Sequence, residues 1–187
     1  MIAEKFYYSD TPVSKESALL LYSAIISNTI NFQSQVTTSR DQNMASWLKD
    51  KIKIPQNYIN EMFKAKSNFK YLLKKTIFDE CAIFNINNQK IGISQLEIVN
   101  ANLFVKENIT NIKAILSSIK TSKSLDIIFL SLIDLKHAFN IFIVIDQTSQ
   151  NLIEKILKLQ FKNSISKTEH IIMRKEIIPL IREYFQN

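Results

Sequence analysis

Residues 77–99 read IFDECAIFNINNQKIGISQLEIV, and this stretch decides the class of fold. Ile77–Ile86 and Lys90–Val99 are β-prone runs, and Asn87-Asn88-Gln89 separates them. Asparagine tolerates the positive φ angles of a tight hairpin turn, so the turn does not need a glycine. The stretch therefore predicts a β-hairpin.

Further helices and strands are predicted on the C-terminal side of this hairpin. Apolar residues at helical spacing predict a helix over 103–120, another over 152–159 and a last one over 175–185. Continuous apolar runs predict strands over 125–133 and 139–145. This mixture indicates an α+β fold class, with a small mixed sheet and flanking helices.

The N-terminal side of the hairpin is predicted to be a helical segment. Ser14 is placed to cap a helix that ends near Asn28, and Thr38 with Asp41 resembles a capping box that opens a second helix. Pro55 fits the first turn of a third helix. The helical segment is thus expected to precede the sheet.

The composition limits the classes of partner. Lys and Arg number 24 against 17 Asp and Glu, and the net charge of +7 allows an anionic partner. The lysines are spread over several segments and no nucleic-acid module signature is present, so no specific nucleic-acid partner is expected. Gly92 is the one glycine in the chain, which excludes the glycine-rich loops that cradle phosphates in nucleotide-binding proteins.

Cysteine usage and hydropathy favour a cytoplasmic protein. Cys81 is the single cysteine, so an internal disulfide is excluded, and the N-terminus lacks the apolar run of a signal peptide. The most apolar stretch, 127–145, is interrupted by Asp134, Lys136 and His137. Charged side chains are costly in a bilayer, and we therefore expect neither a membrane span nor a membrane partner.

Four blocks of sequence carry a family resemblance, and they are Ser14–Ser34 with Val36–Asp41, Phe84 with Lys90–Val99, Leu125–Asp134, and Met173–Leu180. The first is similar to a helix, a Ser-Asp-Thr motif and a Thr-Thr-x-x-Asp turn, and the last resembles a Ser-Arg-Lys-Lys-Gln-Val-Val-Pro signature. The middle two look like the opening hairpin and central strand of the DHH-associated C-terminal domain of the second type. In this order the blocks resemble the C-terminal part of manganese-dependent (family II) inorganic pyrophosphatases, in the DHH phosphoesterase superfamily.

The resemblance implies a division of the chain. Residues 1–65 would be the tail of the DHH domain with its linker, and residues 66–187 the DHH-associated C-terminal, substrate-binding domain. The basic, weakly patterned segment 64–75 is the best candidate for the linker. On this reading the first two thirds or so of the DHH domain lies outside the chain.

The resemblance also implies a metal cofactor. In the family, aspartates and histidines of the N-terminal domain hold Mn²⁺ or Mg²⁺, which activates the attacking water. This chain has no Asp-His-His sequence, its two histidines are His137 and His170, and Asn28 stands at a family metal-ligand position. A neutral amide lacks the negative charge that holds a metal pair, so we expect this chain alone to bind no metal and to contribute no catalytic residue.

The substrate-binding residues implied by the signature are Arg174 and Lys175. Their planar fork of donors and compact positive charge suit phosphate oxygens, although a solvated first turn of the last helix explains them equally well. One family cation is missing at Met173 or Glu176, depending on the alignment, and a family substrate lysine aligns with Ala82.

The sequence also predicts binding or structural roles for four residues outside this pair. Lys90 and Lys167 are weaker candidates for a phosphate contact, and Asp134 is expected to be a structural carboxylate at a strand end. Cys81 is expected to be a buried small hydrophobe.

Three functions remain open on the sequence. The leading one is the substrate-closing half of a pyrophosphatase-like hydrolase acting on pyrophosphate or short polyphosphate, present as a fragment, a split gene product or a degenerate homologue. It would not be hydrolytic by itself, and a separate DHH half is its implied partner. The alternatives are a non-catalytic interaction or polyanion-binding module derived from the family, and a self-sufficient hydrolase with a new metal site.

Self-association is a further expectation. The family buries the apolar face of residues 1–50 against the rest of the DHH domain, so here that face is expected to be exposed or paired in a homo-oligomer. Its residues are Leu20, Leu21, Ile25, Ile26, Trp47 and Leu48.

Overall fold

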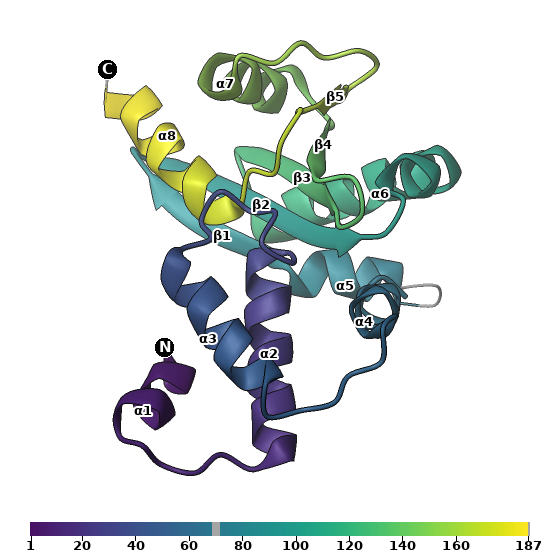
Figure 1. Cartoon of the computed structure of the whole chain (residues 1–187). Helices are drawn as coiled ribbons and strands as arrows, with labels where there is room; N and C mark the ends of the chain where they lie inside the picture. The colour runs from purple at the N-terminus through teal and green to yellow at the C-terminus, as the bar shows by residue number, and fades with distance from the viewer. Residues whose placement is uncertain (69–71, 187) are drawn as a thin grey trace. The chain divides into compact units, whose positions relative to one another are not determined.

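The computed structural model describes residues 1–68 and 72–186 (Figure 1). The chain divides into two compact units, unit 1 with residues 1–65 and unit 2 with residues 66–187. Unit 1 is helical, and unit 2 is built around a five-stranded sheet. Across the described ranges, no helix combines the length and the apolar character that crossing a membrane requires.

Unit 1 contains α1 (Ile2–Tyr8), α2 (Lys15–Thr29), α3 (Ser39–Lys49) and α4 (Tyr58–Lys66). Ser14 caps α2, because its Oγ accepts a hydrogen bond from the backbone N–H of Ser17 at 3.1 Å. Thr38 and Asp41 form the predicted capping box of α3, in which the Thr38 N–H donates to Asp41 Oδ2 at 2.9 Å. Both predicted caps are therefore confirmed.

Two local predictions for unit 1 are wrong. Pro55 does not lie in the first turn of α4, since the helix begins at Tyr58 and the Pro55 carbonyl accepts the Tyr58 N–H in the preceding turn. The short helix α1 carries no clear sequence signal and was not predicted. The predicted linker 64–75 is helical at both ends, in α4 and in α5 (Leu73–Asp79), and its residues 69–71 lie outside the described ranges.

The predicted apolar face of unit 1 is mostly covered. Ile25, Ile26 and Leu48 are buried, whereas Leu20 is 71% exposed. Helix α2 packs against α3, and α3 packs against α1, so the amphipathic helices have neighbours within the unit. The expectation that this face is exposed or paired with another copy is therefore wrong for Ile25, Ile26 and Leu48, whereas Leu20 remains exposed.

The sheet of unit 2 has the strand order β1-β2-β3-β4-β5. Its strands are β1 (Cys81–Ile86), β2 (Gln89–Ile98), β3 (Ile127–Asp134), β4 (Phe139–Val144) and β5 (Ile165–Lys167). β2 and β3 are parallel, while the other neighbouring pairs are antiparallel. The predicted mixed sheet and α+β class are confirmed, and β5 is a strand that the sequence did not predict.

Helices cover both faces of this sheet (Figure 1). α5 and α6 (Ala101–Lys123) pack on one face, around Ile112, Leu116 and Ile128. α7 (Gln147–Leu157) and α8 (Arg174–Gln186) pack on the other face, around Phe129 and Phe142. Every residue of β3 and β4 is buried, which explains their continuous apolar runs in the sequence.

The hairpin that decides the fold turns at Asn87 and Asn88. Their φ angles are 48° and 61°, so both residues adopt the left-handed conformation that the sequence predicts. The first predicted strand is wrong at its start, because Ile77 belongs to α5 and β1 begins at Cys81. Ile77 is fully buried in the core beside α6, and this tertiary contact outweighs its β-propensity.

Gly92 allows β2 to approach its neighbours closely. A Cβ atom at this position would lie 2.5 Å from Leu125 Cδ1 and 3.2 Å from Cys81 Sγ. The single glycine of the chain is therefore explained by packing.

Candidate functional site

Arg174 and Lys175 form the first turn of α8, where the family signature aligns. The Arg174 N–H donates to Gln95 Oε1 at 2.7 Å, and the Met173 N–H donates to Glu176 Oε2 at 2.9 Å. Lys175 is exposed, and no ion pair to it is found within the described ranges. The structure thus brings the two predicted cations together at a helix N-terminus.

Part of the Arg174 guanidinium makes hydrogen bonds within the fold. Nη1 donates to the carbonyl oxygen of Glu80 at 2.8 Å and to that of Ile93 at 3.2 Å. These bonds connect the start of α8 to the chain before β1 and to the middle of β2. Nε and Nη2 carry further donors, so the side chain can serve the fold and an anion together.

Three neighbours limit the positive charge of this site. Met173 is buried and supplies no cation, and Ala82 in β1 supplies none either. Glu176 binds the Met173 N–H with its carboxylate, which stabilises the helix start but repels an approaching anion. Arg174 and Lys175 are therefore the two cations at the start of α8, and the Glu176 carboxylate lies beside them.

Asn140, in β4, positions the segment that leads into α8. It is fully buried, and its Nδ2 donates to Ser131 Oγ at 2.7 Å and to the Ile172 carbonyl at 2.8 Å. Its Oδ1 accepts the Ile172 N–H at 3.0 Å. A polar residue inside a continuous apolar strand was the signal that could have identified this positioning role from the sequence.

Asp134 is a structural carboxylate at the end of β3, as the sequence predicts. It is fully buried and accepts the N–H groups of Ala101, Lys136 and His137 at 2.8–2.9 Å. The ring Nδ1 of His137 lies 3.1 Å from Asp134 Oδ1. These contacts hold the β3–β4 turn against the first residue of α6.

The other candidate residues have contacts of their own. Lys90 Nζ donates to the carbonyl oxygen of Lys123 at 2.6 Å, and Lys167 Nζ lies 3.5 Å from the centre of the Phe139 ring. Cys81 is half-buried, and burial raises the pKa of its thiol, so it is a poor nucleophile near neutral pH. The positive charge of Arg174 partly opposes this rise in the pKa of Cys81, whereas the contacts of Lys90 and Lys167 described above involve neither Arg174 nor Lys175.

The residues present do not fit the metal that the resemblance implies. Asn28 is an exposed neutral amide near the end of α2. Within residues 1–68 and 72–186, no group of three or more His, Cys, Asp or Glu side chains is placed to hold a metal ion. Mn²⁺ and Mg²⁺ sites need several oxygen or imidazole ligands, and the described part of the chain does not supply such a set.

The backbone just after Asn28 is strained. Ile30, Asn31 and Phe32 have φ angles of 51°, 52° and 66°, a conformation that costs about 1–2 kcal/mol for most residues other than glycine. The hydroxyls of Ser34 and Thr37 in the same turn are buried, and neither has a hydrogen-bond partner among residues 1–68 and 72–186. This turn follows the Ser-Asp-Thr-like motif, and no pattern in the sequence predicts its strained backbone.

Comparisons with known proteins agree with this fold. A family model described as the DHHA2 domain matches residues 60–184. The chain is 31% identical over 192 residues to a manganese-dependent inorganic pyrophosphatase of Methanothrix thermoacetophila, covering 100% of this chain and 61% of that protein. A probable manganese-dependent inorganic pyrophosphatase of Clostridium acetobutylicum is 28% identical, over 96% of this chain and 58% of that protein.

A solved structure shows a similarity to the same group of proteins. The chain is similar to a putative family II inorganic pyrophosphatase of Methanococcus jannaschii, with a TM-score of 0.84, 25% identity, and coverage of 100% of this chain and 64% of that one. The chain therefore spans 58–64% of the length of these proteins and resembles their C-terminal part. Because the family model matches well over half of the chain, the protein belongs to the DHHA2 domain family.

Proposed function

We propose that this chain is the substrate-closing half of a pyrophosphatase-like phosphohydrolase, which binds pyrophosphate or short polyphosphate through Arg174 and Lys175. The observation that carries the proposal is the adjacent pair of cations at the start of α8, inside the region that the DHHA2 model matches. Arginine offers a planar fork of donors to phosphate oxygens, and lysine offers a compact positive charge. Residues 1–65 act in this proposal as the tail of a DHH domain.

The chain alone binds its substrate in this proposal but does not hydrolyse it. Hydrolysis of a phosphoanhydride at neutral pH requires an activated water, which this family obtains from divalent metals. The described residues supply no metal-ligand cluster, and Asn28 has no charge. A separate DHH half that supplies Mn²⁺ or Mg²⁺ ligands is therefore the partner we propose for activity.

Affinity for pyrophosphate is expected to be weak. The site is partly exposed, Glu176 opposes the anion, and Arg174 already serves two carbonyl oxygens. We expect a dissociation constant on the order of 0.1 to 1 mM at low salt. Affinity should fall as salt is added, because exposed charges are screened.

Titration of pyrophosphate into the full chain tests the binding. The Arg174→Ala/Lys175→Ala double variant should lose most of the affinity, whereas Lys155→Ala/Lys162→Ala removes the same charge from exposed positions elsewhere in unit 2 and should change it little. Equal binding by the two double variants would show that the anion follows diffuse positive charge and would refute the site.

A hydrolysis assay tests the catalytic part of the proposal. The chain with Mn²⁺ should release phosphate no faster than a mock purification, and addition of a DHH domain from a relative should raise the rate. Chelator-sensitive turnover by the chain alone would refute the proposal and favour a new metal site. If pyrophosphate binds but no DHH domain restores turnover, the chain acts as the polyanion-binding module of the second hypothesis.

A further inference from the structure

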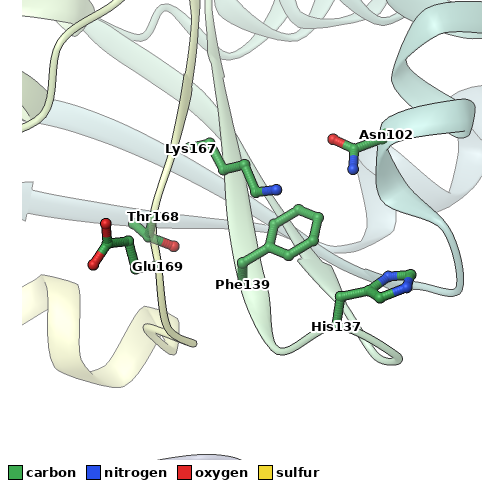
Figure 2. Close-up of a pocket in the computed structure, with 6 residues that line it drawn as sticks. All are labelled: Asn102, His137, Phe139, Lys167, Thr168 and Glu169. Carbon is green, nitrogen blue, oxygen red and sulfur yellow. The ribbon is translucent and has the colours of Figure 1, made fainter.

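A pocket of unit 2 lies at the end of the sheet where β3 turns into β4. It has a volume of about 520 Å³ and is lined by Asn102, His137, Phe139, Lys167, Thr168 and Glu169 (Figure 2). This volume is within the usual range for small-molecule sites. The six residues come from α6, the β3–β4 turn, β4, and β5 with the segment after it, so the tertiary structure builds the pocket.

Lys167 presents its positive charge in a fixed place. Nζ lies 3.5 Å above the centre of the Phe139 ring, which holds the side chain by a cation–π contact. No carboxylate pairs with Lys167 anywhere in the described ranges. The charge is therefore oriented toward the pocket without being neutralised, which reduces the entropy that a ligand must overcome.

Polar side chains line the same space. Figure 2 shows Lys167 Nζ, the Asn102 amide and the His137 ring beside Phe139, while the Glu169 carboxylate points away from Lys167. The His137 ring is stacked near Phe139, with centroids 6.3 Å apart. The buried Asp134 carboxylate behind the turn is already bound by three backbone N–H groups, which limits its repulsion of an anion.

The site lies apart from Arg174. Arg174 contacts Ile93 in β2, and Ile98, five residues further along that strand, pairs with Asp134 beside the pocket. Five residues of strand span about 16 Å, so one phosphate group cannot contact both places. The pocket is thus independent of the anion site in the proposed function.

We propose that this pocket binds the phosphate group of a small molecule through Lys167 and the Asn102 amide, beside the His137 ring. Inorganic phosphate and a phosphate monoester share this chemistry. The exposed mouth of the pocket makes the affinity modest, with a dissociation constant on the order of 1 mM. We therefore expect the occupancy of the pocket to follow the concentration of a phosphate compound, and we expect no reaction to take place in it.

NMR titration of the full chain tests this site. The chain has two histidines, so the ring signals of His137 are assigned by comparison with His137→Gln. Inorganic phosphate and glycerol phosphate are added in parallel, with sodium chloride at matched ionic strength as the reference. The His137 signals should move saturably with at least one of the two phosphates and not with chloride; the tighter of the two identifies the source of the phosphate group.

Matched variants distinguish binding at this pocket from attraction to positive charge elsewhere on the surface. Lys167→Gln should weaken binding about tenfold, because it removes one charge-assisted hydrogen bond, and Lys167→Arg should retain most of it. Lys162→Gln removes the same charge from an exposed position near β5 and should have little effect. Arg174→Ala/Lys175→Ala should leave the His137 shift intact, whatever its effect on pyrophosphate.

Three results would overturn the proposal. The first is a set of His137 signals that follow ionic strength alone. The second is equal weakening by Lys167→Gln and Lys162→Gln, and the third is loss of the His137 shift in the Arg174→Ala/Lys175→Ala variant. Lys167 is exposed, so its replacement is not expected to unfold the chain, and Asn102→Ala provides a second variant at another exposed position.

Discussion

The side chain of Asn140 pairs with the backbone of Ile172 through two hydrogen bonds, one in each direction. Asn140 Nδ2 donates to the Ile172 carbonyl at 2.8 Å, and the Ile172 N–H donates to Asn140 Oδ1 at 3.0 Å. The two residues are 32 positions apart, and Ile172 lies two residues before Arg174. The Asn140 amide therefore makes the pair of hydrogen bonds that a neighbouring strand would otherwise make with Ile172. These bonds set the direction in which the chain enters α8.

Replacement of Asn140 by Ala should strongly destabilise unit 2. It leaves Ser131 Oγ and both backbone groups of Ile172 without their present partner in a buried place, and we expect a loss of about 2–4 kcal/mol in the free energy of unfolding. Urea denaturation measures the loss. Asn151→Ala, at an exposed position in α7, is the control and should change stability little; equal losses would contradict the positioning role.

Arg174 and Lys175 should differ in what they contribute to the stability of the fold. Arg174→Ala removes two hydrogen bonds to carbonyl oxygens and should cost about 1–3 kcal/mol of stability, since bonds from a charged donor are the stronger kind. Lys175→Ala should stay within about 0.5 kcal/mol of the wild type, as exposed substitutions usually do. Thermal or urea denaturation of both single variants decides this, and an equal cost would argue against a structural role for Arg174.

Asn88→Gly should stabilise the hairpin between β1 and β2. Asn88 has a φ of 61°, which glycine adopts without steric cost, so we expect a gain of about 0.5–1 kcal/mol. Asn85→Gly is the matched control: Asn85 lies within β1, where glycine should destabilise by a similar amount. Urea denaturation of the two variants should show shifts in opposite directions, and a destabilised Asn88→Gly chain would show that the asparagine side chain itself is needed.

The stability of unit 1 should depend on Glu4 in acid. Arg40 donates from Nε and Nη2 to the two Glu4 carboxylate oxygens, and this bidentate bond, together with a hydrogen bond from the Met1 ammonium, lowers the pKa of Glu4 from 4.5 to about 2. A carboxyl group whose pKa is lower in the folded state stabilises the fold above its unfolded pKa. That contribution is therefore complete above pH 4.5 and is lost as the pH falls toward 2.

Glu4→Gln should remove this part of the acid sensitivity. The difference in unfolding free energy between wild type and Glu4→Gln should be largest above pH 4.5 and should shrink as the pH approaches 2. Glu61→Gln is the control, because the Glu61–Lys64 pair is exposed and contributes little. A wild-type advantage that stays constant across this range would contradict the lowered pKa.

Predictions from the sequence succeeded where contacts are local. The turn at Asn87-Asn88 and the cap at Ser14 involve residues within three positions of one another, so short-range geometry alone decides them. The order of the family blocks likewise identified the DHHA2 region that the family model matches. The stretch around Ile77 was mispredicted because a buried contact with the core beside α6 overrode local propensity.

The sequence by itself determined the α+β class, the hairpin, two helix caps and the adjacent cations Arg174 and Lys175. The tertiary structure alone decided what these cations contact, because Glu80 and Ile93 are 94 and 81 residues away from Arg174 along the chain. It also decided the pocket beside the β3–β4 turn, where Asn102, Phe139 and Lys167 meet from three separate segments. Long-range contacts of this kind form when the sheet brings distant segments together, and no local pattern of side chains specifies them.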